Sequence, residues 1–256
     1  MEYRPLDVSR NEVRLITIQP AEDDSPNVLR CVIEHYSLDD YTLEYRNFQS
    51  TFPQDKKWGG MFTAWRGFCL QKIGLPENCD IPEGRKHPQV YILFRYTWGD
   101  YAAISYAWGE DTYRRSITLN GHRFHVIDNL YTFLETHRAA GQFGRTVKVW
   151  VDAICINQND IAERSAQIQR MRNIYSLALC SFAWLGPEGD NSDEAIDMLE
   201  AMNLALETPD FLQIDGNYSS EFLTNYQELI DSFEPWQWKA LFSFFDWPYW
   251  KRLWIL

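Results

Sequence analysis

Two apolar runs that stop abruptly in polar residues limit what this chain can fold into more than any other feature. The first covers residues 103–111 and the second covers residues 149–160. Buried strands of an open parallel sheet read as near-continuous apolar runs, and ligands gather where the carboxyl ends of those strands emerge. We therefore expect the polar ends of the two runs to face one another across one crevice. The side chains expected there are Ser105, Trp108, Glu110 and Asp111 from the first run, and Asp152, Cys155, Asn157 and Gln158 from the second.

The segments around these runs predict an α/β fold with a mostly parallel sheet flanked by helices. Strands are expected over 101–106, 147–152 and 180–185, helices over 128–138 and 160–178, and a hairpin over 117–126. The hairpin is indicated by Asn120-Gly121, a preferred two-residue turn. Strands that alternate with helices are typical of a parallel core.

The helix over 160–178 is the one that the sequence predicts most clearly. Asp160 followed by Glu163 three residues later fits a capping box, in which each side chain bonds the other residue's backbone N–H. A stripe at helical spacing predicts the face that packs on the core. Its members are Ile161, Arg164 or Ser165, Ile168, Met171, Ile174 or Tyr175, and Ala178.

Outside this core we expect three further regions. Residues 1–36 contain strand candidates at 13–18 and 28–33, and they form an N-terminal β elaboration. Residues 37–96 are broken by proline and glycine and read as an insertion, with one strand near 90–96. The core then covers 97–186, and 187–256 is a helical extension. Its terminal run, 247–256, is apolar without a cap or polar tail, which favours a truncated end.

Composition limits the partners and the compartment. The 24 Lys and Arg against 36 Asp and Glu give a net charge of −12, which argues against a nucleic-acid or anionic-membrane surface. No apolar run approaches the roughly 20 residues that span a bilayer. The five cysteines are an odd number without zinc spacing, and no signal peptide follows Met1, so a reducing, cytoplasmic location is expected. Eleven Trp predict a bulky core and favour a protein partner or self-association.

Each candidate side chain has a functional and a structural explanation. Asp152 ends an apolar strand, where a carboxylate is costly to bury unless it is paired or caps the next turn. It either orients a ligand or catalytic group, or it caps. Cys155 lies between two isoleucines, which favours a buried, unreactive thiol over a nucleophile. Glu163 is explained by the capping box.

The remaining polar candidates are equally open. Asn157 and Gln158 either bind a polar ligand or satisfy the backbone of a loop. His122 and His125 alternate within the predicted hairpin without a nearby third ligand, so we predict no metal site. The common nucleotide-binding and hydrolase signatures are absent from the sequence.

Taken together, the motifs resemble the heterokaryon incompatibility (HET) domain of filamentous fungi. The match runs in order over roughly 100–186 and is most specific at 152–158. The segments that carry it are 101–109, 129–130, 149–158, 163–164, 167–171, 174–175 and 184–186. In addition, 3–6 and 13–16 resemble the N-terminal start of domains in this family.

The resemblance implies an allorecognition effector that triggers programmed cell death. The family distantly resembles TIR domains, some of which cleave NAD, so the resemblance implies a TIR-like or flavodoxin-like sheet and NAD as a substrate. The expected ligand contacts are Ser105, Tyr106, Trp108, Cys155, Asn157, Gln158, Glu163 and Arg164, with Asp152 and Glu194 as catalytic candidates.

The resemblance also leaves alternatives. HET domains continue the segment over 252–256 with Gln-Glu, so the counterpart of the TIR glutamate is expected after Leu256, and Glu194 is a substitute candidate. Asp193 and Glu194 also have a dipole explanation, because acids favour the first turn of a helix. The other functional hypotheses are a non-enzymatic self-association or docking module and a truncated, inactive paralogue.

Overall fold

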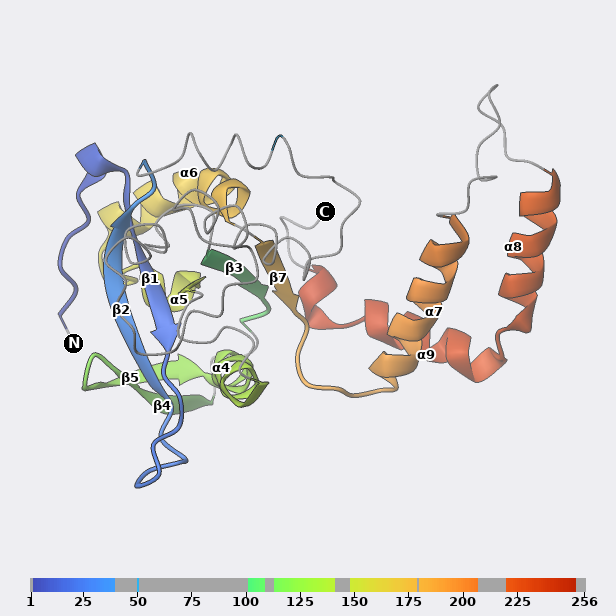
Figure 1. The fold of residues 1–256 in the computed structure, drawn as a ribbon, viewed down its shortest axis with the longest axis horizontal. Helices are drawn as coiled ribbons and strands as arrows, with labels where there is room; N and C mark the ends of the chain where they lie inside the picture. The colour runs from blue at the N-terminus through green and yellow to red at the C-terminus, as the bar shows by residue number, and fades with distance from the viewer. Residues whose placement is uncertain are drawn as a thin grey trace, which may run out of the picture. The chain divides into compact units, whose positions relative to one another are not determined.

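The computed structural model divides the chain into two compact units, Met1–Trp184 and Leu185–Leu256. It describes residues 2–39, 50, 101–108, 113–140, 148–178, 180–206 and 220–251 (Figure 1). Nearly all of the predicted insertion over 37–96, its strand near 90–96, and the candidates Glu110 and Asp111 lie outside the described residues. Among the helices that are described, none is both long and apolar enough to cross a membrane.

The first unit is built on one seven-stranded sheet with the order β5-β4-β2-β1-β6-β3-β7. Its strands are β1 (Glu12–Ile18), β2 (Arg30–Ser37), β3 (Tyr101–Tyr106), β4 (Arg114–Leu119), β5 (His122–Ile127), β6 (Lys148–Trp150) and β7 (Cys180–Trp184). β1 is antiparallel to β2 and to β6, and β4 is antiparallel to β5. The pairs β2–β4, β3–β6 and β3–β7 are parallel.

The prediction of a mostly parallel sheet is corrected by this topology. The described sheet is mixed, and its parallel block consists of β6, β3 and β7 beside the antiparallel β1–β2 pair. β1 is buried at all seven positions and lies in the middle of the sheet, so the N-terminal strands are central to it. A strand buried on both faces has the same apolar signature in either direction, so its sequence cannot reveal its direction.

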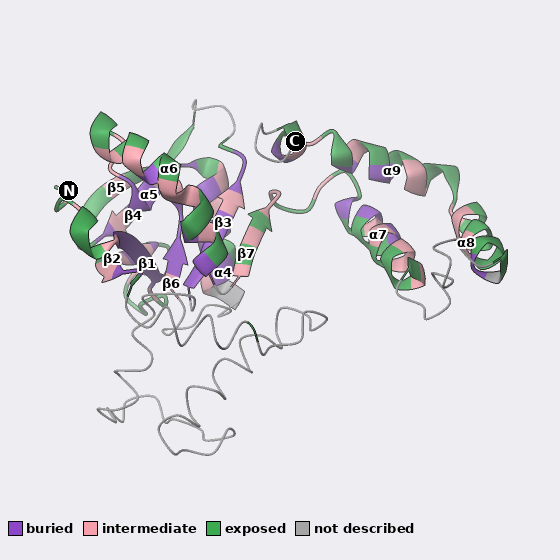
Figure 2. Ribbon diagram, turned by 90° about the horizontal axis from the view of Figure 1, so that it is seen from above, coloured by how far each residue is buried: buried purple, intermediate pink, exposed green. Residues whose placement is uncertain are grey.

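The predicted parallel block does contain both of the opening apolar runs. β3 coincides with the strand expected over 101–106, and β6 is shorter than expected because a helical turn, α5 (Asp152–Cys155), begins at its end. β3 pairs with β6 on one side and β7 on the other, so their carboxyl ends lie along the same edge of the sheet. Figure 2 shows these central strands as largely buried.

Two long helices, α4 (Asp128–Ala140) and α6 (Ile161–Leu177), pack against the sheet. Both were predicted, and Leu130, Phe133 and Leu134 of α4 belong to the core. The C-terminal half of α6 is fastened to β3, because the hydroxyl of Tyr175 donates to the carbonyl oxygen of Ile104 at 3.0 Å.

The buried face of α6 differs from the predicted stripe. Ile174 and Ala178 are buried as predicted. However, Ile161 is 70% exposed and Ile168 is 56% exposed, and Gln167 is buried in the first half of the helix instead. The face that turns inward is therefore polar in the first half of the helix and apolar in the second half. The polar network described below explains the difference.

The hairpin formed by β4 and β5 has the predicted turn. Asn120 and Gly121 both adopt positive φ, at 48° and 79°, as a type I′ turn requires. The Asn120 amide also clamps β2, because its Oδ1 accepts from the N–H of Ile33 at 2.9 Å and its Nδ2 donates to the carbonyl of Ile33 at 3.0 Å. This clamp extends the short parallel pairing of β2 with β4.

The second unit is helical, as predicted. It contains α7 (Ser192–Leu206), α8 (Ser220–Ser232), α9 (Pro235–Phe245) and the short 3-10 helix η2 (Pro248–Lys251). α7 and α9 share a small core of Ala195, Met198, Leu241 and Phe244.

We expect Asn120→Asp to lower the free energy of unfolding by about 2 kcal/mol. The substitution preserves the acceptor and tolerates positive φ, but it sets a carboxylate oxygen against the carbonyl of Ile33. The matched control is Asn159→Asp, an exposed site in the same unit, with an expected change within about 0.5 kcal/mol. Urea unfolding measures the free energy of unfolding of both variants. Equal decreases in the two would contradict a stabilising role for the Asn120 clamp.

Candidate functional site

The structure brings together the polar ends of β3 and β6. Trp108 follows β3 and Asp152 follows β6, and the indole Nε1 of Trp108 donates to Oδ2 of Asp152 at 3.3 Å. Asp152 is half-buried, while 45% of Trp108 is exposed. A carboxylate and an accessible aromatic face therefore lie side by side at the carboxyl edge of the parallel block.

The segment that carries Asp152 is held by bonds to its own backbone. Oδ1 of Asp152 accepts from the N–H of Ala153 at 2.7 Å, and Nε2 of Gln158 donates to the carbonyl of Asp152 at 2.9 Å. Oδ1 of Asn157 accepts from the N–H of Asn159 at 3.2 Å. The amides of Asn157 and Gln158 thus make the backbone contacts that one of their two sequence interpretations expected.

Asn129 and Trp184 lie at the same edge and were missed as site residues. Nδ2 of Asn129 donates to the carbonyl of Ala107 at 2.8 Å, and its Oδ1 accepts from Nε1 of Trp184 at 2.9 Å. Asn129 therefore ties the start of α4 to the ends of β3 and β7. The sequence signal was available, because Trp184 ends a predicted strand whose carboxyl end belongs to this edge.

The other predicted site residues are more scattered. Ser105 is half-buried and Tyr106 is buried, both within β3. Arg164 is exposed on α6. Glu194 belongs to the second unit, where its carboxylate accepts a hydrogen bond from Nε2 of Gln237 and so links α7 to α9.

Cys155 lies in the core behind this edge. Its Sγ accepts from the N–H of Val151 at 3.4 Å, and burial raises the pKa of the thiol to about 12. A thiol that stays protonated at neutral pH is a poor nucleophile. The structure thus places Cys155 as the buried, unreactive residue favoured by its two isoleucine neighbours.

A buried ion pair holds the segment over 152–158 in place through its backbone. Arg14 of β1 is 1% exposed, and its guanidinium donates to both carboxylate oxygens of Glu163, at 2.6 and 3.0 Å. The same guanidinium donates to the carbonyl oxygens of Cys155, at 3.1 Å, and of Arg4, at 2.6 Å. One side chain thereby joins the N-terminal segment, the sheet, the turn after α5 and the start of α6.

Glu163 has a different role from the one the capping box predicts. Asp160 caps α6 as expected, since its side chain accepts from the N–H of Glu163 at 3.0 Å. The Glu163 carboxylate faces Arg14 and also accepts from the N–H of Asn157 at 2.8 Å. Burial alone would raise its pKa, but the bonds from Arg14 and Asn157 outweigh burial and lower the pKa.

His35 and Tyr3 complete the buried network. The guanidinium Nε–H of Arg14 donates to Nε2 of His35 at 3.3 Å, so Nδ1 carries the His35 proton and donates to Glu12 at 3.0 Å. Burial lowers the pKa of His35. Tyr3 donates to the carbonyl of Ile154 at 2.7 Å, and its ring lies 4.8 Å from the Arg14 guanidinium.

The chemistry available at the edge is limited and specific. Trp108 offers a flat apolar face, and Asp152 offers an anionic oxygen beside it. Within the part of the chain that the structure describes, no group of three or more His, Cys, Asp or Glu side chains could hold a metal ion. The arrangement suits an aromatic ligand that bears positive charge.

Comparisons with known proteins agree with the motif resemblance. A family model described as "Heterokaryon incompatibility protein (HET)" matches residues 101–256. The chain is 34% identical over 131 residues to "Heterokaryon incompatibility protein 6, OR allele" of Neurospora crassa, a match that covers 47% of this chain and 18% of that protein. No solved structure matches the chain.

Glu163→Gln should lower the free energy of unfolding by about 3 kcal/mol near neutral pH, because it leaves the buried Arg14 without its counter-charge. The lowered pKa of Glu163 fixes the sign of the pH dependence. Its stabilisation is complete above the unfolded-state pKa of about 4.3 and is lost as the pH falls through the lower folded value. The difference in the free energy of unfolding between the wild type and the variant should therefore disappear below about pH 4.

The control for this prediction is Glu135→Gln, which removes a half-exposed carboxylate 3.9 Å from Arg115. A surface pair of this kind contributes at most about 1 kcal/mol. Urea unfolding followed at pH 7 and at pH 3 compares the two variants. If Glu163→Gln lowered the free energy of unfolding by the same amount at both pH values, the ion pair would not be the source of the lost stability.

Proposed function

The chain belongs to the heterokaryon incompatibility (HET) family, and we propose that it acts as an effector of fungal allorecognition that triggers cell death. The observation that carries this proposal is the family match over residues 101–256, which includes the whole parallel block and its polar edge. The similarity to a Neurospora crassa incompatibility protein supports it. The effector works in the cytoplasm, and the described cysteines, Cys31, Cys155 and Cys180, are free thiols in keeping with a reducing compartment.

The ligand of the effector in this proposal is a nicotinamide nucleotide, NAD. The support is the pairing of Trp108 with Asp152 at the carboxyl ends of β3 and β6. The exposed indole face can stack on the cationic nicotinamide ring, and the carboxylate lies beside that face. Ligands of α/β sheets gather at such strand ends. The distant likeness of the family to TIR domains points to the same substrate.

The reaction in this proposal is hydrolysis of the bond between nicotinamide and ribose. As the C–N bond breaks, its electron pair leaves with neutral nicotinamide, and positive charge develops on the ribose. Asp152 stabilises that charge electrostatically, and water adds to the ribose carbon with release of a proton, which yields ADP-ribose. No covalent nucleophile is needed, which accords with the buried position of Cys155.

Trp108→Ala should weaken NAD binding about tenfold, because it removes one aromatic stacking partner. Isothermal titration with NAD measures the affinity. Trp236→Ala is the matched control, since Trp236 is also half-exposed but belongs to the second unit, and it should leave the affinity unchanged. Equal affinities in all three proteins would remove Trp108 from the site.

Asp152→Asn should keep NAD affinity within about threefold and slow nicotinamide release at least roughly a hundredfold, as expected for loss of transition-state charge stabilisation. Chromatographic detection of free nicotinamide measures the reaction. Asp128→Asn is the control, because Asp128 is an exposed carboxylate at the start of α4. Wild-type protein that binds NAD without releasing nicotinamide would refute the hydrolysis, and absence of binding would refute the nucleotide site and favour a docking module.

A further inference from the structure

The outer face of α6 combines exposed aliphatic and basic side chains. Ile161, Arg164, Ile168 and Arg172 recur at helical spacing, and all four are exposed. Neither arginine forms an ion pair with any residue that the structure describes. We call this set the α6 face. Figure 2 shows the green, exposed side of α6 on the first unit.

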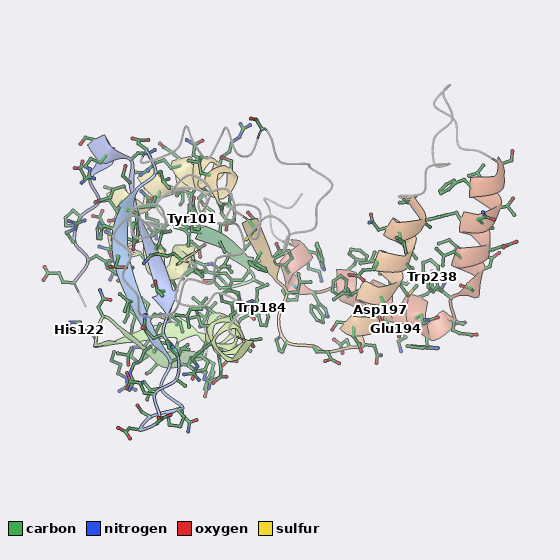
Figure 3. All side chains as sticks on the ribbon, viewed as in Figure 1. Tyr101, His122, Trp184, Glu194, Asp197 and Trp238 are labelled. Carbon is green, nitrogen blue, oxygen red and sulfur yellow. The ribbon has the colours of Figure 1, made fainter. Side chains whose placement is uncertain are left out.

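The outer face of α7 in the second unit has the opposite charge. Asp193, Ile196, Asp197, Glu200 and Leu204 are exposed at the same spacing, and α7 contains no Lys or Arg. None of the three carboxylates forms an ion pair with a described cation. We call this set the α7 face; Figure 3 labels Asp197 on it.

The charge of the whole chain is concentrated in the unit that carries the α7 face. Residues 185–256 contain 14 Asp and Glu against 3 Lys and Arg, whereas residues 1–184 contain 22 against 21. Nearly all of the net charge of −12 therefore belongs to the second unit. The acidic second unit attracts a basic surface and repels the second unit of another copy.

The two faces also match in length and in pattern. Each extends over 11 residue steps, 161–172 and 193–204, which is about 16 Å along a helix axis. Each carries two aliphatic side chains together with charges of one sign. Antiparallel or parallel contact of two such helices would bury the four aliphatic side chains and pair the arginines with carboxylates.

We propose that this chain self-associates head to tail, with the α6 face of one copy docked on the α7 face of a second copy. The occupant is a second copy because one chain carries both complementary faces, each exposed. Such a heterologous contact repeats from copy to copy and builds rings or open filaments. This assembly does not depend on the nucleotide site proposed above.

The contact is small, because it joins one helix face to another. Interfaces of this size lie below the standard class and are weak, so we expect a dissociation constant of roughly micromolar or higher. Exposed arginine–carboxylate pairs are screened by salt, so raising the ionic strength should weaken association. These two properties distinguish the contact from a purely apolar dimer.

Charge reversal on the full chain tests the proposal by sedimentation velocity over a hundredfold range of concentration. The wild type should form species larger than a monomer as concentration rises. Arg164→Glu with Arg172→Glu, or Asp197→Lys with Glu200→Lys, should weaken association at least tenfold. The matched controls reverse exposed charges elsewhere, as Arg114→Glu with Arg123→Glu and as Glu228→Lys with Asp231→Lys, and should associate like the wild type.

Two combinations identify the pairing itself. An equimolar mixture of the two face variants should recover assembly, because the intact faces of the two variants complement each other and so do their two reversed faces. A chain that carries both reversals should recover self-association, since the charges again complement one another. A wild type that stays monomeric, or combined reversals that fail to restore association while both single variants remain folded by circular dichroism, would overturn the proposal.

Discussion

The geometry of the first unit depends on the buried ion pair between Arg14 and Glu163, which joins positions 149 residues apart in the sequence. A buried guanidinium is tolerated only when its charge and its donors are satisfied, and here a carboxylate, two backbone carbonyls and His35 satisfy them. Because Glu163 also receives the N–H of Asn157, the pair fixes both ends of the turn between α5 and α6. The ion pair thereby helps to set the position of Asp152 at the sheet edge.

A second set of hydrogen bonds joins the segments at this edge. Asn129 links the ends of β3 and β7 through Ala107 and Trp184, and Gln158 closes the backbone turn on Asp152. A site built on such bonds holds its side chains in place before a ligand arrives, which lowers the entropic cost of binding. Trp108 is the least enclosed member, and its bond to Asp152 orients the indole. Asn129 and Gln158 thus hold the backbone of the edge, whereas Trp108 and Asp152 are the side chains available to a ligand.

Sequence patterns predicted local structure well because its causes are local. The Asn120-Gly121 turn, the Asp160 cap and the helical character of the region after residue 187 each follow from neighbouring residues. The capping pattern misassigned Glu163 because the competing partner, Arg14, comes from a distant strand. The direction of β1 was equally hidden, since burial on both faces leaves no directional mark. The sequence located Trp108 and Asp152 and included Asn129 in the family motif, but the role of Asn129 depends on its contacts with Ala107 and Trp184, which the sequence does not show.

The polar inner face of the first half of α6 connects the buried network to the surface. Turning Glu163 and Gln167 inward places Ile161 and Ile168 outward, because residues on opposite faces of one helix cannot both be buried against the same sheet. Exposing two isoleucines costs favourable burial energy that a monomer does not recover. Their position beside two arginines is understandable if another apolar surface of opposite charge covers them. The constraint that shapes the candidate site thereby also produces the face that we assign to assembly.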